Sequence, residues 1–286
     1  MSRSVEEALP PWLLAVTAMF VVQLGSALSM PVMREIGAGG TAWLRLTFGA
    51  IIFIIIGRPK LKSIVRHDVP YLVGLGVATG LLTFAFLSAM ELIPLGTAVA
   101  IEFLGPLTVA AIRSHNKQAL IWPALALLGV LLLTQPWLGE INIEGVAYAL
   151  LAAVCWGLYI VLTQEIGDRY SGMSGLALTI PIAALTAGIF GIPQAIGNLS
   201  LNILLAGFGL AILLPIIPYA LELMALRRMT SNAFGTLMAL EPAIGVILGI
   251  LILQQIPNSL QVIGILLVVY AGASAQRGGL RKLLGE

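Results

Sequence analysis

Two carboxylates lie within stretches of the chain that are otherwise apolar. Glu102 belongs to the run AIEFLGPL at 100–107, and Glu241 belongs to ALEPAIG at 239–245. Each run sits near the middle of an apolar segment about as long as the core of a bilayer is thick. An ionised carboxylate at that depth costs about 3 kcal/mol or more. Acids at these positions therefore indicate a functional role.

A proline accompanies each carboxylate. Pro106 and Pro242 lack the N–H that would bond the carbonyl four residues earlier, and those carbonyls belong to Glu102 itself and to Met238. A helix with an acid and unpaired backbone at one depth must face protein or water rather than lipid. Two interpretations follow: a substrate path, or a static kink whose charge is paired to a neighbouring helix. The cost of ionisable groups in membranes favours the path.

Arg45 is the cation best placed to meet these acids. A pair between Arg45 and Glu102 could be purely structural, since buried charges in membranes usually find partners. The pair could equally exchange partners with a zwitterion. Arg45 would then bind the substrate carboxylate, and Glu102 or Glu241 would bind its ammonium through charge-assisted hydrogen bonds. The residues that we predict to line a central cavity are Gln23, Arg45, Thr83, Glu102, Trp156, Tyr159, Tyr219 and Glu241.

Two further groups of side chains have alternative interpretations. Trp156 and Tyr159 share a face at helical spacing, where an aromatic pair can serve as packing or as a wall of the binding pocket. Glu222 lies close to Arg227 and Arg228, and we expect an interfacial ion pair there.

Prolines and glycines inside the apolar segments predict bends and close helix contacts. Two prolines within four residues, just before Tyr219, favour a bend that can act as a hinge. The spacing Gly-x-x-x-Gly at 76–80 and at 245–249 allows two helices to approach closely. The predicted hinge residues are Gly105, Pro106, Pro215, Pro218 and Pro242.

Composition places the whole chain in a membrane. Hydrophobic residues make up 59% of the 286 residues and charged residues only 10%, whereas a soluble domain has about 25% charged residues. The net charge of +2 does not suggest a nucleic-acid partner. The single cysteine, Cys155, lies in an apolar run and can form no intrachain disulfide.

The sequence lacks the motifs that several classes of enzyme and pump require. The sequence contains no HExxH, GxSxG, P-loop or paired-cysteine pattern, which argues against an intramembrane hydrolase and an ATP-driven pump. We therefore expect no cofactor, no metal site and no enzymatic activity. An intramembrane enzyme such as a lipid transferase remains a remote alternative, because it would need a polar catalytic cluster at one interface.

Runs of about 20 apolar residues predict an all-α polytopic membrane protein with ten transmembrane helices. The predicted spans are 12–31, 41–57, 70–90, 95–112, 119–136, 145–164, 173–193, 203–224, 231–252 and 259–275. The breaks between them fall at polar or Pro/Gly clusters, the first at 34–40 and the shortest at 91–94.

The basic residues predict the orientation of these spans. With both termini in the cytoplasm, every lysine and arginine except Arg34 and Arg45 lies on the cytoplasmic side. Merging two spans anywhere would reverse all later loops and remove this asymmetry. We therefore expect ten spans with both termini cytoplasmic.

Ten spans divide into two sets of five with opposite orientations. Weak internal similarity supports the division: at an offset of 136 residues, Leu104 and Pro106 match Leu240 and Pro242. Inverted repeats with interrupted helices near the midplane are typical of transporters. We predict a first five-helix repeat at 1–138 and a second at 139–286, which ends in a short basic tail.

Three longer runs resemble a known family. PLGTAVAIEFLGPLTVA at 94–110, CWGLYIVLTQ at 155–164 and IPYALELMALRRMTSNAFGTLMALEPAIG at 217–245 are similar to the drug/metabolite transporter superfamily, EamA type. Within it they look most like the branch that exports threonine and homoserine from bacteria, and a neighbouring branch exports aromatic amino acids. The resemblance implies a ten-helix, inverted-repeat exporter in the bacterial cytoplasmic (inner) membrane.

The functional expectation is a secondary carrier that exports small neutral amino acids such as threonine, homoserine or methionine by alternating access. Its partners would be the amino acid, the lipid bilayer and possible coupling protons, and the carrier would be a monomer or weak dimer. Proton antiport would need a carboxyl group that changes protonation, with Glu102 and Glu241 as candidates; a facilitator fits the sequence equally well. The alternative is efflux of aromatic amino acids or cationic drugs, which Trp156 and Tyr159 in the cavity would favour.

Overall fold

The computed structural model describes residues 10–59, 64–113, 120–138, 142–166, 173–226, 228, 234 and 237–278. Throughout these residues the regular secondary structure is helical. Helices satisfy every backbone group within one segment, which is the condition for crossing a bilayer. The prediction of an all-α membrane protein is confirmed: seven of the described helices are long and apolar enough to span a membrane.

The helices coincide with the apolar segments of the sequence. In chain order they are α2 (Pro11–Gly57), α3 (Val69–Leu92), α4 (Leu95–Glu102), α5 (Leu104–Arg113), α6 (Ile121–Thr134), α7 (Ile143–Ile166), α8 (Met173–Ala195), α9 (Leu201–Ala211), α10 (Ile217–Leu226), α12 (Glu241–Leu253) and α13 (Ser259–Gly278). Short 3-10 turns lie at Arg66–Asp68 and Pro136–Leu138, and the π-helical segment η6 (Ile212–Ile216) joins α9 to α10. Residues 231–233, at the start of the predicted ninth span, lie outside the described residues.

Helix α2 folds back on itself at Gly37. This residue has φ 72 and ψ 168, a conformation that only glycine adopts readily. A continuous helix would separate Gly25 from Gly49 by about 36 Å. Yet a β-carbon on Gly25 would lie 3.5 Å from Leu214, and one on Gly49 would lie 3.3 Å from the adjacent Pro215. Both arms of α2, 11–36 and 38–57, therefore reach the same turn of η6 and run antiparallel.

Side chains from distant helices cap the start of the second arm. The first N–H groups of a helix have no intrahelical partner. Here the Glu91 carboxylate accepts the N–H of Ala38, and Gln194 Oε1 accepts those of Gly39 at 2.9 Å and Gly40 at 3.4 Å. The sequence predicted an irregular break at 34–40; the break is a single residue because these caps allow the helix to restart at once.

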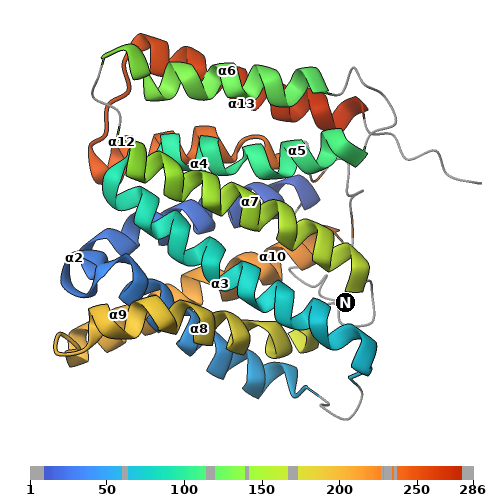
Figure 1. Ribbon diagram of the computed structural model, residues 1–286, viewed down its shortest axis with the longest axis vertical. Coiled ribbons are helices and arrows are strands. Elements are labelled where there is room, and N and C mark those ends of the chain that lie inside the picture. Colours follow the sequence, from blue (N-terminus) through green and yellow to red (C-terminus); the bar gives the residue numbers. More distant parts are fainter. Residues whose placement is uncertain are drawn as a thin grey trace, which may run out of the picture.

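Glycines set the spacing of the remaining helices, which lie roughly alongside one another in Figure 1. Helices α6 and α13 touch at Gly129 and Gly264, where a β-carbon on either glycine would lie 2.6 Å from the carbonyl oxygen of the other. On α3, Gly76 and Gly80 lie against the backbone of α8, because a β-carbon there would meet carbonyl oxygens at 2.8 and 2.5 Å. The predicted Gly-x-x-x-Gly contact at 76–80 is confirmed.

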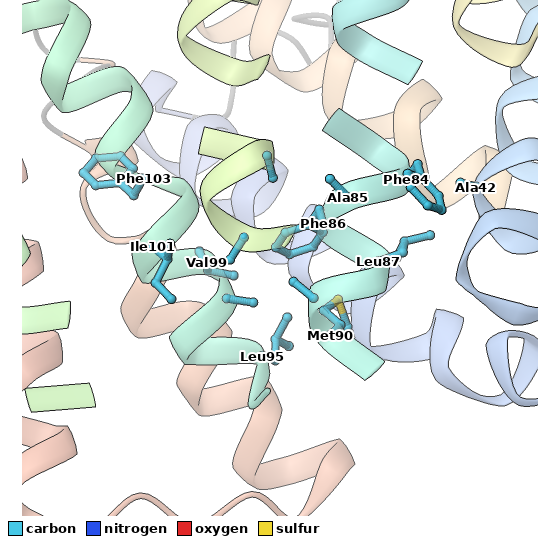
Figure 2. Packing of buried hydrophobic residues seen from close by; sticks show 14 of the residues in the cluster. Ala42, Phe84, Ala85, Phe86, Leu87, Met90, Leu95, Val99, Ile101 and Phe103 are labelled. Atoms are coloured by element: carbon cyan, nitrogen blue, oxygen red, sulfur yellow. The ribbon is translucent and has the colours of Figure 1, made fainter. Parts of the chain in front are cut away.

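Apolar side chains fill the space between α3 and α4. Figure 2 shows Phe86, Leu87 and Met90 of α3 beside Leu95 and Val99 of α4, and all of these are buried. Large aliphatic side chains also cover the outside of the helices; Ile112, Leu185 and Leu251 are at least 70% exposed. The buried polar residues include Gln23, Arg45, Glu102 and Glu241. This distribution, apolar outside with charges inside, is that of a protein dissolved in lipid.

Candidate substrate site

Glu102 ends α4 at a point where the helix is interrupted. Phe103 forms a turn between α4 and α5 yet keeps φ −64 and ψ −15, so the segment changes its hydrogen bonding without reversing direction. Pro106 has no N–H to give to the Glu102 carbonyl. The Phe103 ring lies edge-on to Trp156, with ring centroids 6.2 Å apart. It also fits against Gly272, where a β-carbon would lie 2.6 Å from the ring. These contacts fix the position of Glu102.

Glu241 is the first residue of α12, and Pro242 follows it in the first turn. A proline is tolerated there because the first N–H groups of a helix have no intrahelical partner. The first turn also favours a carboxylate, since the helix dipole is positive at its N-terminus. The sequence placed Pro242 inside a span at 231–252, and the structure places it at a helix start.

The two carboxylates reach the same level because α4 and α12 pack antiparallel. A β-carbon on Gly96 would meet Val246, and one on Gly245 would meet Val99. Following this register along α4 brings Glu102 to the start of α12. Glu102 is indeed within electrostatic range of Glu241. Their exposed fractions are 9% and 5%, so two acids from separate helices share one buried site.

Arg45 of α2 completes a charged triad with these acids. It is 4% exposed and lies within electrostatic range of Glu102. The two side chains do not form an ion pair within 4 Å; the described residues include such a pair between His67 and Asp68 at 3.6 Å, but none at Arg45 or Glu102. The purely structural close pair of Arg45 and Glu102, one of the two alternatives that the sequence left open, is therefore not formed.

Two buried polar atoms of α2 lack hydrogen-bond partners. They are Arg45 Nη1 and Gln23 Oε1, and Gln23 is 2% exposed. Leaving a buried donor or acceptor unsatisfied costs about 1–3 kcal/mol, more when it is charged. Native proteins rarely carry such atoms unless water, an ion or a ligand meets them. One atom is a cationic donor and the other a neutral acceptor, which suits a ligand carrying both kinds of group.

A second polar group extends the site toward α7 and α10. The Tyr159 and Tyr219 hydroxyls form a hydrogen bond with each other, and the Tyr219 ring lies edge-on to Phe53 with centroids 6.3 Å apart. Glu222 lies within electrostatic range of both tyrosines and of Glu241. Electrostatic interactions join Arg45 to Glu102, Glu102 to Glu241, and Glu241 to Glu222. Glu222 interacts in the same way with Tyr219, whose hydroxyl is hydrogen-bonded to that of Tyr159.

The remaining predicted residues, Trp156 and Thr83, and the additional residue Glu222 differ in how they are connected to the site. Trp156 reaches the site through its contact with Phe103. Thr83 is 9% exposed on α3, and no described interaction joins it to the carboxylates. Glu222 is the residue whose neighbours the sequence did not indicate: we expected Arg227 and Arg228, of which Arg227 lies outside the described residues. The sequence did contain one indication of this placement: Glu222 follows Tyr219 by three residues, so both lie on the same face of a helix.

The predicted hinge residues occupy two kinds of place. Pro215 lies in η6, where Leu214 has φ −153 and ψ 112 and the helix is bent; Pro218 follows in the first turn of α10. Gly105 has a packing role, since a β-carbon there would lie 2.0 Å from the Ala153 carbonyl oxygen of α7. The structure therefore contains the predicted bend at 212–218, together with a tight contact between α5 and α7.

Known proteins with similar sequences identify the family. The threonine/homoserine exporter RhtA of Salmonella typhimurium is 34% identical over 270 residues, covering 92% of this chain and 91% of that protein. The chain belongs to the EamA-like transporter family. The family profile itself matches residues 143–273, and the RhtA exporter of Escherichia coli K12 is 32% identical over 276 residues, 92% of this chain and 91% of that protein.

Structural similarity agrees with this family membership. One solved crystal structure has a TM-score of 0.59 to this EamA-like chain, with coverage of 95% of this chain and 99% of that chain. The sequence identity is 21%, so the comparison shows a shared fold only. Membership of the EamA-like family makes this multi-pass membrane protein a transporter rather than an enzyme.

Proposed function

We propose that this protein exports small neutral amino acids, such as threonine, homoserine or methionine, across the cytoplasmic membrane of a bacterium by alternating access. The observation that carries the proposal is the buried triad of Arg45, Glu102 and Glu241, whose charges lie near one another without closing into an ion pair. Relatives named as threonine/homoserine exporters, 32–34% identical over nine tenths of the chain, supply the substrate class.

The charges of the triad match those of a zwitterion. The guanidinium of Arg45 can bind a substrate carboxylate through two parallel hydrogen bonds, and its Nη1 has no partner among the residues that the structure describes. The carboxylates of Glu102 and Glu241 accept hydrogen bonds only and suit an ammonium group. A neutral amino acid placed between them would meet both needs with its backbone groups and leave its side chain toward Gln23 or Trp156.

The same proposal includes a ten-pass topology with cytoplasmic termini and two inverted halves, 1–138 and 139–286. Three observations support it. The arms of α2 run antiparallel, as two consecutive spans would. The family profile matches 143–273, which is the second half alone. The contact between Gly129 and Gly264 is reciprocal, as expected where counterpart helices of two inverted halves meet on their pseudo-two-fold axis.

Alternating access would move one half against the other around the triad. Bends at Gly105–Pro106, at Pro215 and Pro218, and at Pro242 would absorb the change in backbone direction. Energy would come from the substrate gradient or from protons. In a proton-coupled cycle, Glu102 or Glu241 would release its proton when the ammonium group binds, and would take up another on return.

Export of aromatic amino acids or cationic drugs is the second candidate. Trp156 is half-buried beside Phe103, next to Glu102, and the pair of Tyr159 and Tyr219 lies near Glu222. Aromatic rings near carboxylates can hold a cationic aromatic ligand by cation–π attraction.

Counterflow in proteoliposomes tests these candidates against each other. Vesicles are loaded in turn with threonine, methionine, phenylalanine or a cationic dye, and uptake of the labelled compound is measured. We expect exchange of threonine and methionine. Exchange of phenylalanine or dye alone would favour the second candidate, and exchange of none of the four would contradict an amino-acid exporter.

The variant Glu102→Gln tests the role of the acid in the cycle. We expect it to abolish pH-dependent exchange, because the amide cannot release a proton or pair with an ammonium group. The matched control is Glu165→Gln at the exposed end of α7, which should exchange like the wild type. Wild-type exchange by a well-folded Glu102→Gln protein at all pH values would remove Glu102 from the mechanism.

A further inference from the structure

A cavity of about 220 Å³ lies at the end of the molecule where α4 begins and α12 ends. Its walls also include the end of α6 and the start of α13, which come together at the left edge of Figure 1. In the ten-pass topology proposed above this end faces away from the cytoplasm. The cavity is partly open, and its lining combines apolar residues such as Val246 and Ile265 with the polar residues Thr97, Gln255 and Gln261.

The walls of the cavity are held by hydrogen bonds between amide side chains and backbone. Gln255 Oε1 accepts the N–H of Leu95 at 2.9 Å, which ties the loop after α12 to the start of α4. Gln261 Nε2 donates to the Leu133 carbonyl at 3.2 Å, which ties α13 to α6. Behind them, Gln135 and Asn258 exchange two amide hydrogen bonds of 2.8 and 3.1 Å. The cavity is therefore a built site with fixed walls.

Thr97 directs an unused polar group into this cavity. The residue is 4% exposed and lines the cavity, and its hydroxyl forms no hydrogen bond within the described ranges of the chain. Seven described threonines, at 41, 79, 108, 134, 163, 179 and 186, each bond the carbonyl four residues earlier, whereas Thr17, Thr47 and Thr83, like Thr97, do not. A hydroxyl that forgoes this bond is available to a ligand.

The cavity and the charged triad lie on one seam. Both are formed where α4 and α12 meet, and Thr97 precedes Glu102 by five residues, about 8 Å along a helix. The helices approach closely along this seam because Gly96 faces Val246 and Gly245 faces Val99. A molecule leaving the triad along α4 would reach this cavity when the two helices move apart during the transport cycle.

We propose that the cavity is an exit subsite, in which a small neutral amino acid binds transiently between the charged triad and release. Among the described residues, those that line it carry no ionisable side chain. It can therefore offer a zwitterion the Thr97 hydroxyl and the amide groups of Gln255 and Gln261, but no opposite charge. An amino acid would consequently bind here more weakly than at the triad. Its volume falls below the roughly 300–1,000 Å³ of pockets that hold drug-sized ligands, so it admits amino acids and excludes larger compounds.

The substrate class of this subsite rests on the proposed function, and the experiment separates the two. In a Cys155→Ala background, Thr97→Cys is reacted with a membrane-impermeant thiosulfonate reagent from outside, with and without threonine. We expect threonine to slow the labelling of Thr97→Cys at least threefold. The matched control is Ser259→Cys, exposed at the same end of the molecule and outside the cavity lining, whose labelling should not change.

Transport by a second pair of variants keeps the proposal testable if the cysteine variant folds poorly. Thr97→Val should raise the half-saturation concentration for threonine entering from the outer face about three- to tenfold, as expected for one lost hydrogen bond. Thr97→Ser should restore the wild-type value. Thr108→Val, an exposed position on α5, is the matched control.

Three outcomes are decisive. Protection at Thr97→Cys with altered transport by Thr97→Val supports the subsite. Equal labelling with and without threonine, in a preparation whose parent protein exchanges threonine, overturns the subsite and leaves the proposed function intact. Failure of the parent to exchange any amino acid overturns the proposed function and the ligand class assigned to the cavity.

Discussion

Arg45 Nη1 and Gln23 Oε1 are the two described buried side-chain atoms that have no hydrogen-bond partner. Each reduces the stability of the empty protein, since an unsatisfied buried polar atom costs about 1–3 kcal/mol. A carrier can use this cost, because a substrate that satisfies both atoms recovers it on binding. The stability lost in the empty state then appears as affinity for the right ligand.

Arg45 can be tested with a substrate that lacks a carboxylate. We expect Arg45→Gln to weaken threonine binding about 10- to 100-fold, since a hydrogen bond to a charged group contributes about 1.5–3 kcal/mol. Threoninol, the amino alcohol, should bind wild type and variant equally. Competition of each compound against labelled threonine in proteoliposomes measures both effects. Equal losses for the two compounds would show that Arg45 acts on folding rather than on the carboxylate.

Sequence alone identified some of these residues and not others. Glu102 and Glu241 were predictable because a carboxylate inside a long apolar run has few structural explanations. Glu222 was harder to interpret because its nearest cations in the sequence, Arg227 and Arg228, suggested a local pair. Its place near Glu241 depends on how α10 and α12 each pack against α2, which no local pattern reports.

At the scale of elements, apolar length was sufficient to predict the helices but not their ends. Predicted and observed helix boundaries differ by a few residues, as for 145–164 against Ile143–Ile166 in α7. The sequence predicted a longer break at 34–40 and not a tight turn at Gly37. The residues that cap the turn, Glu91 and Gln194, come from α3 and α8. Such long-range capping leaves no signal in the 34–40 segment itself.

Gly37 offers a direct test of this turn. Gly37→Ala should destabilise the protein by about 1–3 kcal/mol, the cost of a non-glycine residue at such backbone angles, and a β-carbon would also lie 2.4 Å from Gln194 Oε1. Gly209→Ala in α9 is the matched control, because a β-carbon there meets nothing within 4 Å. Thermal unfolding in detergent measures both; equal midpoints for the two variants would contradict this account of the turn.

At the scale of the whole molecule, the fold places polar groups along the α4–α12 seam and apolar groups toward lipid. Among the described residues, the cavity at one end of that seam has no ionisable lining, whereas the triad further along has three ionisable side chains. In the proposed pathway, affinity for a zwitterion would therefore fall from the triad to the exit. Substrate affinity that decreases in that direction would favour release on the outer side.

The proposed orientation can be tested with single cysteines in the Cys155→Ala background. Ser259→Cys lies at the end of the molecule that we assign to the outside, and His67→Cys is exposed at the opposite end. An impermeant thiol reagent added to intact cells should label Ser259→Cys and leave His67→Cys until the membrane is broken. The reverse pattern would show that the protein is inserted the other way round.

The contact of η6 with both arms of α2 has one more consequence. Leu214 and Pro215 rest against Gly25 and Gly49, and these two arms carry Gln23 and Arg45. Any rocking motion at η6 would increase or decrease the distance between Gln23 and Arg45, the two groups that we propose bind the substrate. The same movement would then open the transport pathway and weaken substrate binding. A bulkier residue at Gly49 should therefore change affinity and turnover number together.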